Sequence, residues 1–94
     1  MNNETLERIK NKVKNLPMLP GVYIMKDVSG NIIYVGKAKK LKNRVSQYFI
    51  NNYKQEKVKQ MVFHVYDFDY IIVNSELDAL NLEANLIKKN QPFY

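Results

Sequence analysis

One acidic side chain, Glu83, occupies a position at which a helix would bury it. The segment from Ser75 to about Lys89 has helical periodicity, and at about 100° per residue Glu83 falls in the middle of its apolar arc. The polar residues of the segment take the opposite arc. A carboxylate on an apolar face is costly unless it is paired, protonated or bound to a cation. Glu83 is therefore expected either to pair with a lysine or arginine at the edge of the core or, the alternative that we favour, to be a functional carboxylate.

A second set of chemically capable side chains is a basic row that ends in a tyrosine. Its members are spaced by three or four residues and are Lys37, Lys40, Arg44 and Tyr48. A helix over 38–50 would align them along one flank, where they could grip a phosphate. Arg44 is the member best suited to bidentate contact. The alternative is a solvated helix face that only borders the core.

Two tyrosines, Tyr23 and Tyr34, lie in short strands that flank a turn rich in Gly, Asn and Asp. This pattern predicts a β-hairpin. An even number of loop residues, for instance 27–30, would place Tyr23 opposite Tyr34 on one face, because side chains alternate along a strand. An odd loop would place them on opposite faces.

Local patterns predict the elements that must position these groups. Apolar spacing predicts helices over 3–15, 38–50, 55–65 and 75–89, with a turn at 51–53. Aromatic and β-branched runs predict strands over 21–26, 32–36 and 68–73. Pro17 and Pro20 keep the chain extended before the first strand.

Composition narrows the class of protein. The 94 residues, 46% of them apolar, suit a single domain over 1–94. The chain has no cysteine and one histidine, so a metal would need oxygen ligands. A net charge of +6 with seven tyrosines fits a nucleic-acid partner, although lysine-rich solvated surfaces are also common. No apolar run approaches membrane-spanning length, and we expect a cytoplasmic protein without a membrane partner.

Five short motifs follow one another in a specific order. They are Leu19–Tyr23, Tyr34–Lys39, Asn43–Val45, Leu82–Lys88 and Pro92–Tyr94. Together they resemble the GIY-YIG nuclease family, and within it the N-terminal domain of the UvrC type. The resemblance covers about Pro17 to Tyr94. It implies an α+β fold, in which helices flank a small three-stranded antiparallel sheet.

The resemblance also implies a chemistry, phosphodiester hydrolysis with one divalent ion, Mg²⁺ or Mn²⁺. Glu83 would hold the ion, and Arg44 would bind the scissile phosphate and stabilise its developing charge. Tyr23 or Tyr34 would take part in nucleophile activation, and the choice between them stays open.

The remaining site residues take supporting roles in the resemblance. Tyr48 would hydrogen-bond within the site and Lys37 would contribute charge. Gly36 would allow a close approach to the backbone. Lys40, from the basic row, joins Gly36, Lys37 and Arg44 as a substrate-binding residue.

The expected function is the 3′ incision of bacterial nucleotide excision repair on damaged double-stranded DNA. Regions of a longer protein would recruit UvrB, and we expect the isolated domain to be a monomer. Two alternatives remain open, a stand-alone GIY-YIG nuclease that acts on other DNA structures and a non-catalytic basic DNA-binding module.

Overall fold

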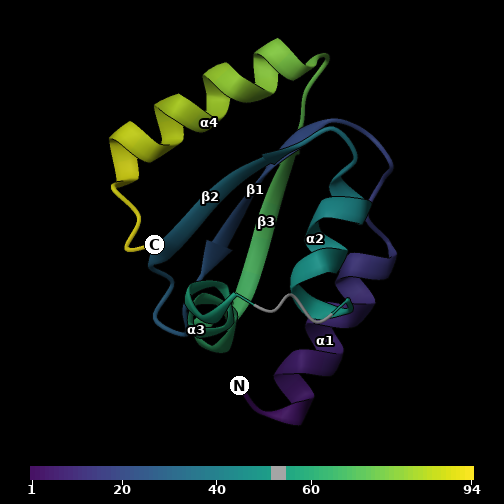
Figure 1. The fold of residues 1–94 in the computed structure, drawn as a ribbon, viewed down its shortest axis with the longest axis vertical. Helices are drawn as coiled ribbons and strands as arrows, with labels where there is room; N and C mark the ends of the chain where they lie inside the picture. The colour runs from purple at the N-terminus through teal and green to yellow at the C-terminus, as the bar shows by residue number, and fades with distance from the viewer. Residues whose placement is uncertain (52–54) are drawn as a thin grey trace.

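The computed structural model describes residues 1–51 and 55–94. Three antiparallel strands in the order β2-β1-β3 form the sheet, and helices lie on both of its faces (Figure 1). The elements are α1 (Asn3–Lys14), β1 (Gly21–Lys26), β2 (Ile32–Ala38), α2 (Leu41–Phe49), α3 (Glu56–His64), β3 (Asp67–Ile72) and α4 (Glu76–Asn90). The predicted α+β class is confirmed. Within the described residues, no helix is both long and apolar enough to cross a membrane.

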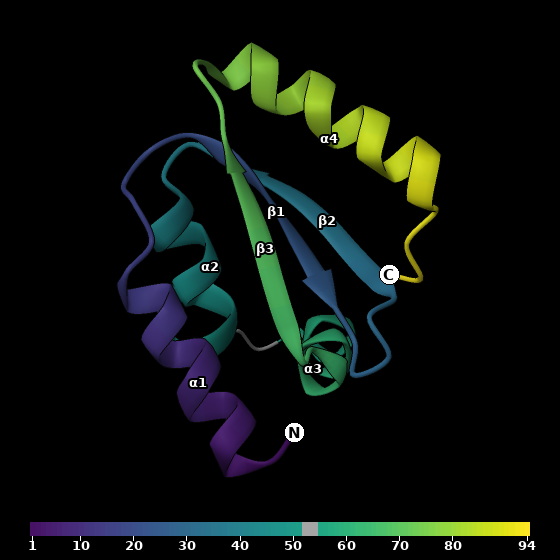
Figure 2. The same cartoon turned by 180° about the vertical axis from the view of Figure 1, so that it is seen from behind.

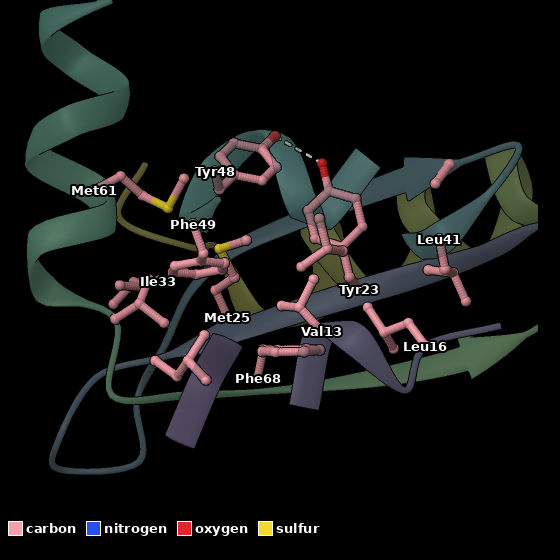
Figure 3. Packing of buried hydrophobic residues seen from close by; sticks show 14 residues of the cluster. Val13, Leu16, Tyr23, Met25, Ile33, Leu41, Tyr48, Phe49, Met61 and Phe68 are labelled. Carbon is pink, nitrogen blue, oxygen red and sulfur yellow. Dashed lines mark hydrogen bonds between the residues drawn. The ribbon is translucent and has the colours of Figure 1, made fainter. Parts of the chain in front are cut away.

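The two faces of the sheet carry separate apolar clusters. Helices α1, α2 and α3 pack on the face that includes Tyr23, Met25 and Phe68, as the close view in Figure 3 shows. Helix α4 covers the other face, on the far side of the sheet from α1 and α2 (Figure 2). Its contacts favour β2, the strand at one edge. The edge of β2 therefore lies between α2 and α4.

The hairpin corrects the predicted pairing of the tyrosines. Tyr23 pairs with Gly36, and Tyr34 pairs with Met25, so the two tyrosines share a face but are offset by two residues. The connection, 27–31, has an odd number of residues, which should have separated them. The register shifts between Met25 and Lys26, and the bulge leaves Ile33 without a partner in β1. The bulge thus returns Tyr23 and Tyr34 to the same face of the sheet, which the odd-numbered loop alone would not allow.

Most predicted helix and strand limits agree with the structure within one residue, but the junction of β2 and α2 was predicted wrongly. β2 continues to Ala38, and α2 begins only at Leu41. The cause is non-local, since Ala38 pairs with Gly21 and the backbone N–H of Leu41 donates to Leu19 O at 3.0 Å. Lys37 is consequently a strand residue. Of the turn predicted over 51–53, residues 52 and 53 lie outside the described ranges.

Candidate active site

Three tyrosines from three different elements form a cluster on the α2 side of the sheet. The ring centroids of Tyr23 lie 6.1 Å from Tyr34 and 5.8 Å from Tyr48, and those of Tyr34 and Tyr48 are 6.3 Å apart. The hydroxyl oxygens of Tyr23 and Tyr48 are 2.8 Å apart and point toward one another in Figure 3. The sheet and α2 thus bring together all three tyrosines that the sequence singled out.

The three tyrosines differ in how deeply their side chains are buried. Tyr23 is 1% exposed, and its pKa is raised by burial and by the adjacent Tyr48. Burial also raises the pKa of Tyr48, which is 6% exposed. Both of these hydroxyls are therefore neutral at pH 7. The side chain of Tyr34 is only half-buried. Of the two tyrosines between which the sequence could not choose, Tyr34 is the more accessible.

Gly36 makes room for the buried ring. A Cβ atom at this position would lie 2.2 Å from both Cζ and Oη of Tyr23. Such a distance is far shorter than a normal contact, so any side chain at Gly36 would displace Tyr23. The structure thus gives Gly36 a packing role against Tyr23, and its predicted role in substrate binding stays a prediction.

Arg44 projects from α2 beside this cluster. Its guanidinium carbon lies 5.5 Å from the Tyr48 ring centroid, and its Nη1 donates to Gln47 Oε1 at 2.8 Å. These two contacts orient a permanently charged, half-buried guanidinium. Gln47 was not predicted as a site residue, although its spacing of three from Arg44 is one at which helical side chains meet.

A groove between the β2–α2 junction and the start of α4 collects the basic residues. Its volume is about 680 Å³. The lining residues are Lys37, Ala38, Lys39, Lys40, Asn43, Arg44, Gln47, Glu76, Leu77, Ala79 and Leu80. We call it the basic groove. Lys37 is a strand residue, and Lys40 is the extended residue that precedes α2. The predicted helical row is therefore wrong, although Lys37, Lys40 and Arg44 all line this groove.

A second groove, about 510 Å³, follows further along β2 and α4. It is lined by Tyr34, Val35, Glu83, Ile87, Lys88, Gln91, Pro92 and Tyr94, and we call it the glutamate groove. Glu83 is half-buried there, and none of the ion pairs among the described residues involves it. The expected alternative of a salt bridge is thus not found in that part of the chain. Pro92 and Tyr94, which belong to the last of the five sequence motifs but were given no role in the site, also line this groove.

The packing of α4 corrects the expected surroundings of Glu83. The helix meets the sheet through Ala79, Leu82 and Leu86, and Glu83 lies at the margin of this contact. Leu80 and Ile87, which at about 100° per residue fall in the same apolar arc as Glu83, are 47% and 42% exposed. The reason is that α4 favours the β2 edge, so the sheet covers only one side of the arc.

The donor set of the glutamate groove fits a hard divalent ion. It offers the carboxylate of Glu83 as an oxygen donor, and Tyr34 lines the same groove. The described residues contain no group of three or more His, Cys, Asp or Glu side chains that could hold a metal. Mg²⁺ commonly uses one or two carboxylates with waters and substrate phosphates, whereas zinc needs a fuller set of protein ligands. The residues present therefore suit Mg²⁺ or Mn²⁺.

A tyrosine-bearing hairpin, an arginine on the next helix and a glutamate on the last helix, all around three antiparallel strands, define a domain of the GIY-YIG type. The family model of the UvrC-like GIY-YIG domain matches residues 19–94. The chain belongs to this family, as the sequence motifs predicted.

Relatives support the same assignment over most of the chain. UvrABC system protein C of Thermoanaerobacter sp. (strain X514) is 64% identical over 87 residues, which cover 92% of this chain and 14% of that protein. The protein of the same name from Methanococcoides burtonii is 58% identical over 83 residues, 87% of this chain and 14% of its own length. The chain thus spans a small part of these curated relatives.

Solved structures match the whole architecture. The GIY-YIG N-terminal endonuclease domain of UvrC from Thermotoga maritima, bound to magnesium as its catalytic divalent cation, superposes with a TM-score of 0.86. It is 44% identical, and the match covers 94% of this chain and 96% of that one. A point mutant of the same domain, also bound to the divalent cation, has the same TM-score at 43% identity. The predicted enzyme class, an endonuclease domain, is confirmed, and the predicted divalent ion agrees with these neighbours.

Proposed function

We propose that this chain makes the 3′ incision of nucleotide excision repair, by hydrolysing a phosphodiester bond of damaged double-stranded DNA with one Mg²⁺ or Mn²⁺ at Glu83. The observation that carries the proposal is the order of the two grooves along β2 and α4. Tyr34 and Glu83 line one groove, and Arg44 lines the next with three lysines. A phosphate chain that crosses both grooves would meet a metal-binding carboxylate and then positive charge.

Each residue of the site has a role that follows from its surroundings. Arg44 binds the scissile phosphate and stabilises charge that develops in the transition state, and the Tyr48 ring and Gln47 hold it in place. Tyr34 Oη accepts a hydrogen bond from the attacking water and orients it toward phosphorus. The water oxygen forms a bond to phosphorus as the bond to the leaving sugar oxygen breaks, the proton of the water is released to solvent, and the leaving oxygen takes up a proton from solvent. When bound, the divalent ion supplies Lewis-acid polarisation of a phosphate oxygen.

Tyr34, rather than Tyr23, is assigned the contact with the nucleophile. Tyr34 lines the groove that contains Glu83, whereas Tyr23 lies beneath the surface and donates or accepts a hydrogen bond with Tyr48. Burial keeps the Tyr23 hydroxyl neutral because it raises the pKa of that group. Tyr23 is therefore a positioning residue that supports the ring of Tyr48, on which Arg44 lies.

The decisive test replaces Glu83 by Gln in the full-length protein, supplied with UvrB and a damaged duplex. We expect Mg²⁺-dependent 3′ nicking to fall roughly 100- to 1,000-fold, because the ion contributes several kcal/mol to the barrier. DNA binding and the melting temperature should change little. Glu56→Gln, an exposed carboxylate on α3, is the matched control and should cleave like the wild type. Unchanged nicking by Glu83→Gln would refute the assignment.

The same experiment separates the two other functions that the sequence left open. A non-catalytic DNA-binding module would show no metal-dependent nicking in the wild type on any substrate. A stand-alone nuclease would cleave other DNA structures without UvrB. The repair function also predicts a cytoplasmic protein that meets UvrB through regions outside these 94 residues, with this domain itself monomeric.

A further inference from the structure

The α4 wall of the basic groove carries two leucines that the core does not use. Leu77 is 65% exposed and Leu80 is 47% exposed, and both line the groove. The sheet contact of α4 is made by other side chains, so the exposure of these two leucines does not serve the fold. They form an apolar strip at the edge of a site that otherwise binds charge.

The opposite wall of the same groove is cationic. Lys37, Lys39, Lys40 and Arg44 line it, and the acidic residue among the lining side chains is Glu76. Glu76 is already paired with Lys39 at 3.4 Å, which leaves a net positive wall. A ligand that fills the groove should therefore present an anionic side toward β2 and α2 and an uncharged, flat or apolar side toward α4.

A nucleotide has this division of chemistry. Its phosphate suits lysine and arginine, and the face of a base or sugar can lie against leucine side chains. The groove volume, about 680 Å³, falls within the range of small-ligand sites. In a paired duplex the base faces are stacked on one another, so an apolar wall can contact them only where a nucleotide is unpaired.

We propose that the basic groove is a subsite for an unpaired nucleotide next to the scissile phosphate. Its phosphate lies on Lys37 and Lys40, and its base or sugar lies on Leu77 and Leu80. This inference rests on the proposed function, because it extends the DNA path from the glutamate groove along β2. It names the substrate feature that the domain selects, which is local single-stranded character at the incision.

The test compares Leu77→Ala/Leu80→Ala with the wild-type chain by fluorescence anisotropy, without divalent metal. The probes are a labelled short oligothymidine and a labelled duplex of the same length. We expect affinity for the single strand to fall about five- to tenfold, and affinity for the duplex to change less than about twofold, because only unpaired bases reach the leucines. The salt dependence should stay unchanged, since no charge is removed.

Two further variants make the comparison specific. Val28→Ala/Phe63→Ala removes apolar side chains that are 75% and 64% exposed and line neither groove, and it should bind both probes like the wild type. Lys40→Gln should weaken both probes and reduce the salt slope by about one. Thermal unfolding of each variant shows whether the fold is kept.

Equal losses on both probes, or no loss on either, would overturn the subsite. Failure of the proposed function has a different signature, since Glu83→Gln would then nick like the wild type. The binding comparison contains no metal and is interpretable in either case.

Discussion

Replacement of Gly36 by alanine tests the close packing of Tyr23 most directly. The new Cβ would meet Cζ and Oη of Tyr23 at 2.2 Å, so the ring must move by more than about 1 Å to reach normal contact. The ring is 1% exposed, and its hydroxyl is held by Tyr48 at 2.8 Å. Movement therefore overpacks the core, at about 1–3 kcal/mol, and breaks a buried hydrogen bond, at about 1 kcal/mol.

The total loss, about 2–4 kcal/mol, is large for a domain of this size. At roughly 4–8 °C per kcal/mol, the melting temperature should fall by at least about 8 °C. Circular dichroism melting of the wild-type chain and of Gly36→Ala measures this shift. The same Gly36→Ala replacement is also measured in a Tyr23→Leu variant, which lacks the ring atoms that the new Cβ would meet.

In the Tyr23→Leu background, Gly36→Ala should cost less than about 1 kcal/mol, because the clashing atoms are gone and alanine is otherwise the better strand residue. The reasoning is refuted if Gly36→Ala leaves the wild-type melting temperature unchanged. It is equally refuted if the loss has the same size in both backgrounds, since the effect would then not involve the Tyr23 ring.

Two further predictions concern the tyrosine and arginine environment. Because the pKa of Tyr23 is raised in the folded state, the unfolded chain loses this proton first, near pH 10, so unfolding free energy should fall as pH rises above about 10. Melting temperatures measured against pH should show a shallower fall for Tyr23→Phe, and parallel curves would contradict the prediction. Gln47→Ala should lower the single-turnover cleavage rate about three- to tenfold with little change in DNA affinity, because it removes one hydrogen bond that orients Arg44. Arg44→Ala sets the scale with a loss of about 100-fold or more, and a Gln47→Ala rate equal to wild type would show that the tyrosine contacts position the guanidinium without Gln47.

Local chemistry accounts for the part of the fold that could be predicted. The N-cap of α4 at Ser75, whose side chain accepts from the backbone N–H of Asp78 at 3.1 Å, follows from residue type alone. The hairpin, the strands and the helices were also predicted within narrow limits, because periodicity is a property of neighbouring residues. The residue types needed for phosphodiester chemistry are visible in the same way.

Long-range pairing accounts for what could not be predicted. The bulge at Ile33 sets which residue faces Tyr23, and the pairing of Ala38 with Gly21 keeps Lys37 in a strand. Both depend on β1, and nothing in the residues around Lys37 distinguishes an early helix start from an extended strand. The basic residues meet in one groove even though the helical row inferred for them does not exist.

The sequence was sufficient to identify a chain with a tyrosine hairpin, a basic segment and a glutamate on an apolar helix face. The position of α4 along the β2 edge then gave these groups their surroundings: Glu83 and Tyr34 line one groove, and two leucines stay exposed. Tyr23 is buried in the cluster on the opposite face of the sheet. An amphipathic pattern states which side of a helix is apolar, but not how much of that side its partner covers. That coverage depends on the width of the sheet and on which strand forms its edge. Both are set by the pairing of distant strands and cannot be read from a single segment of the sequence.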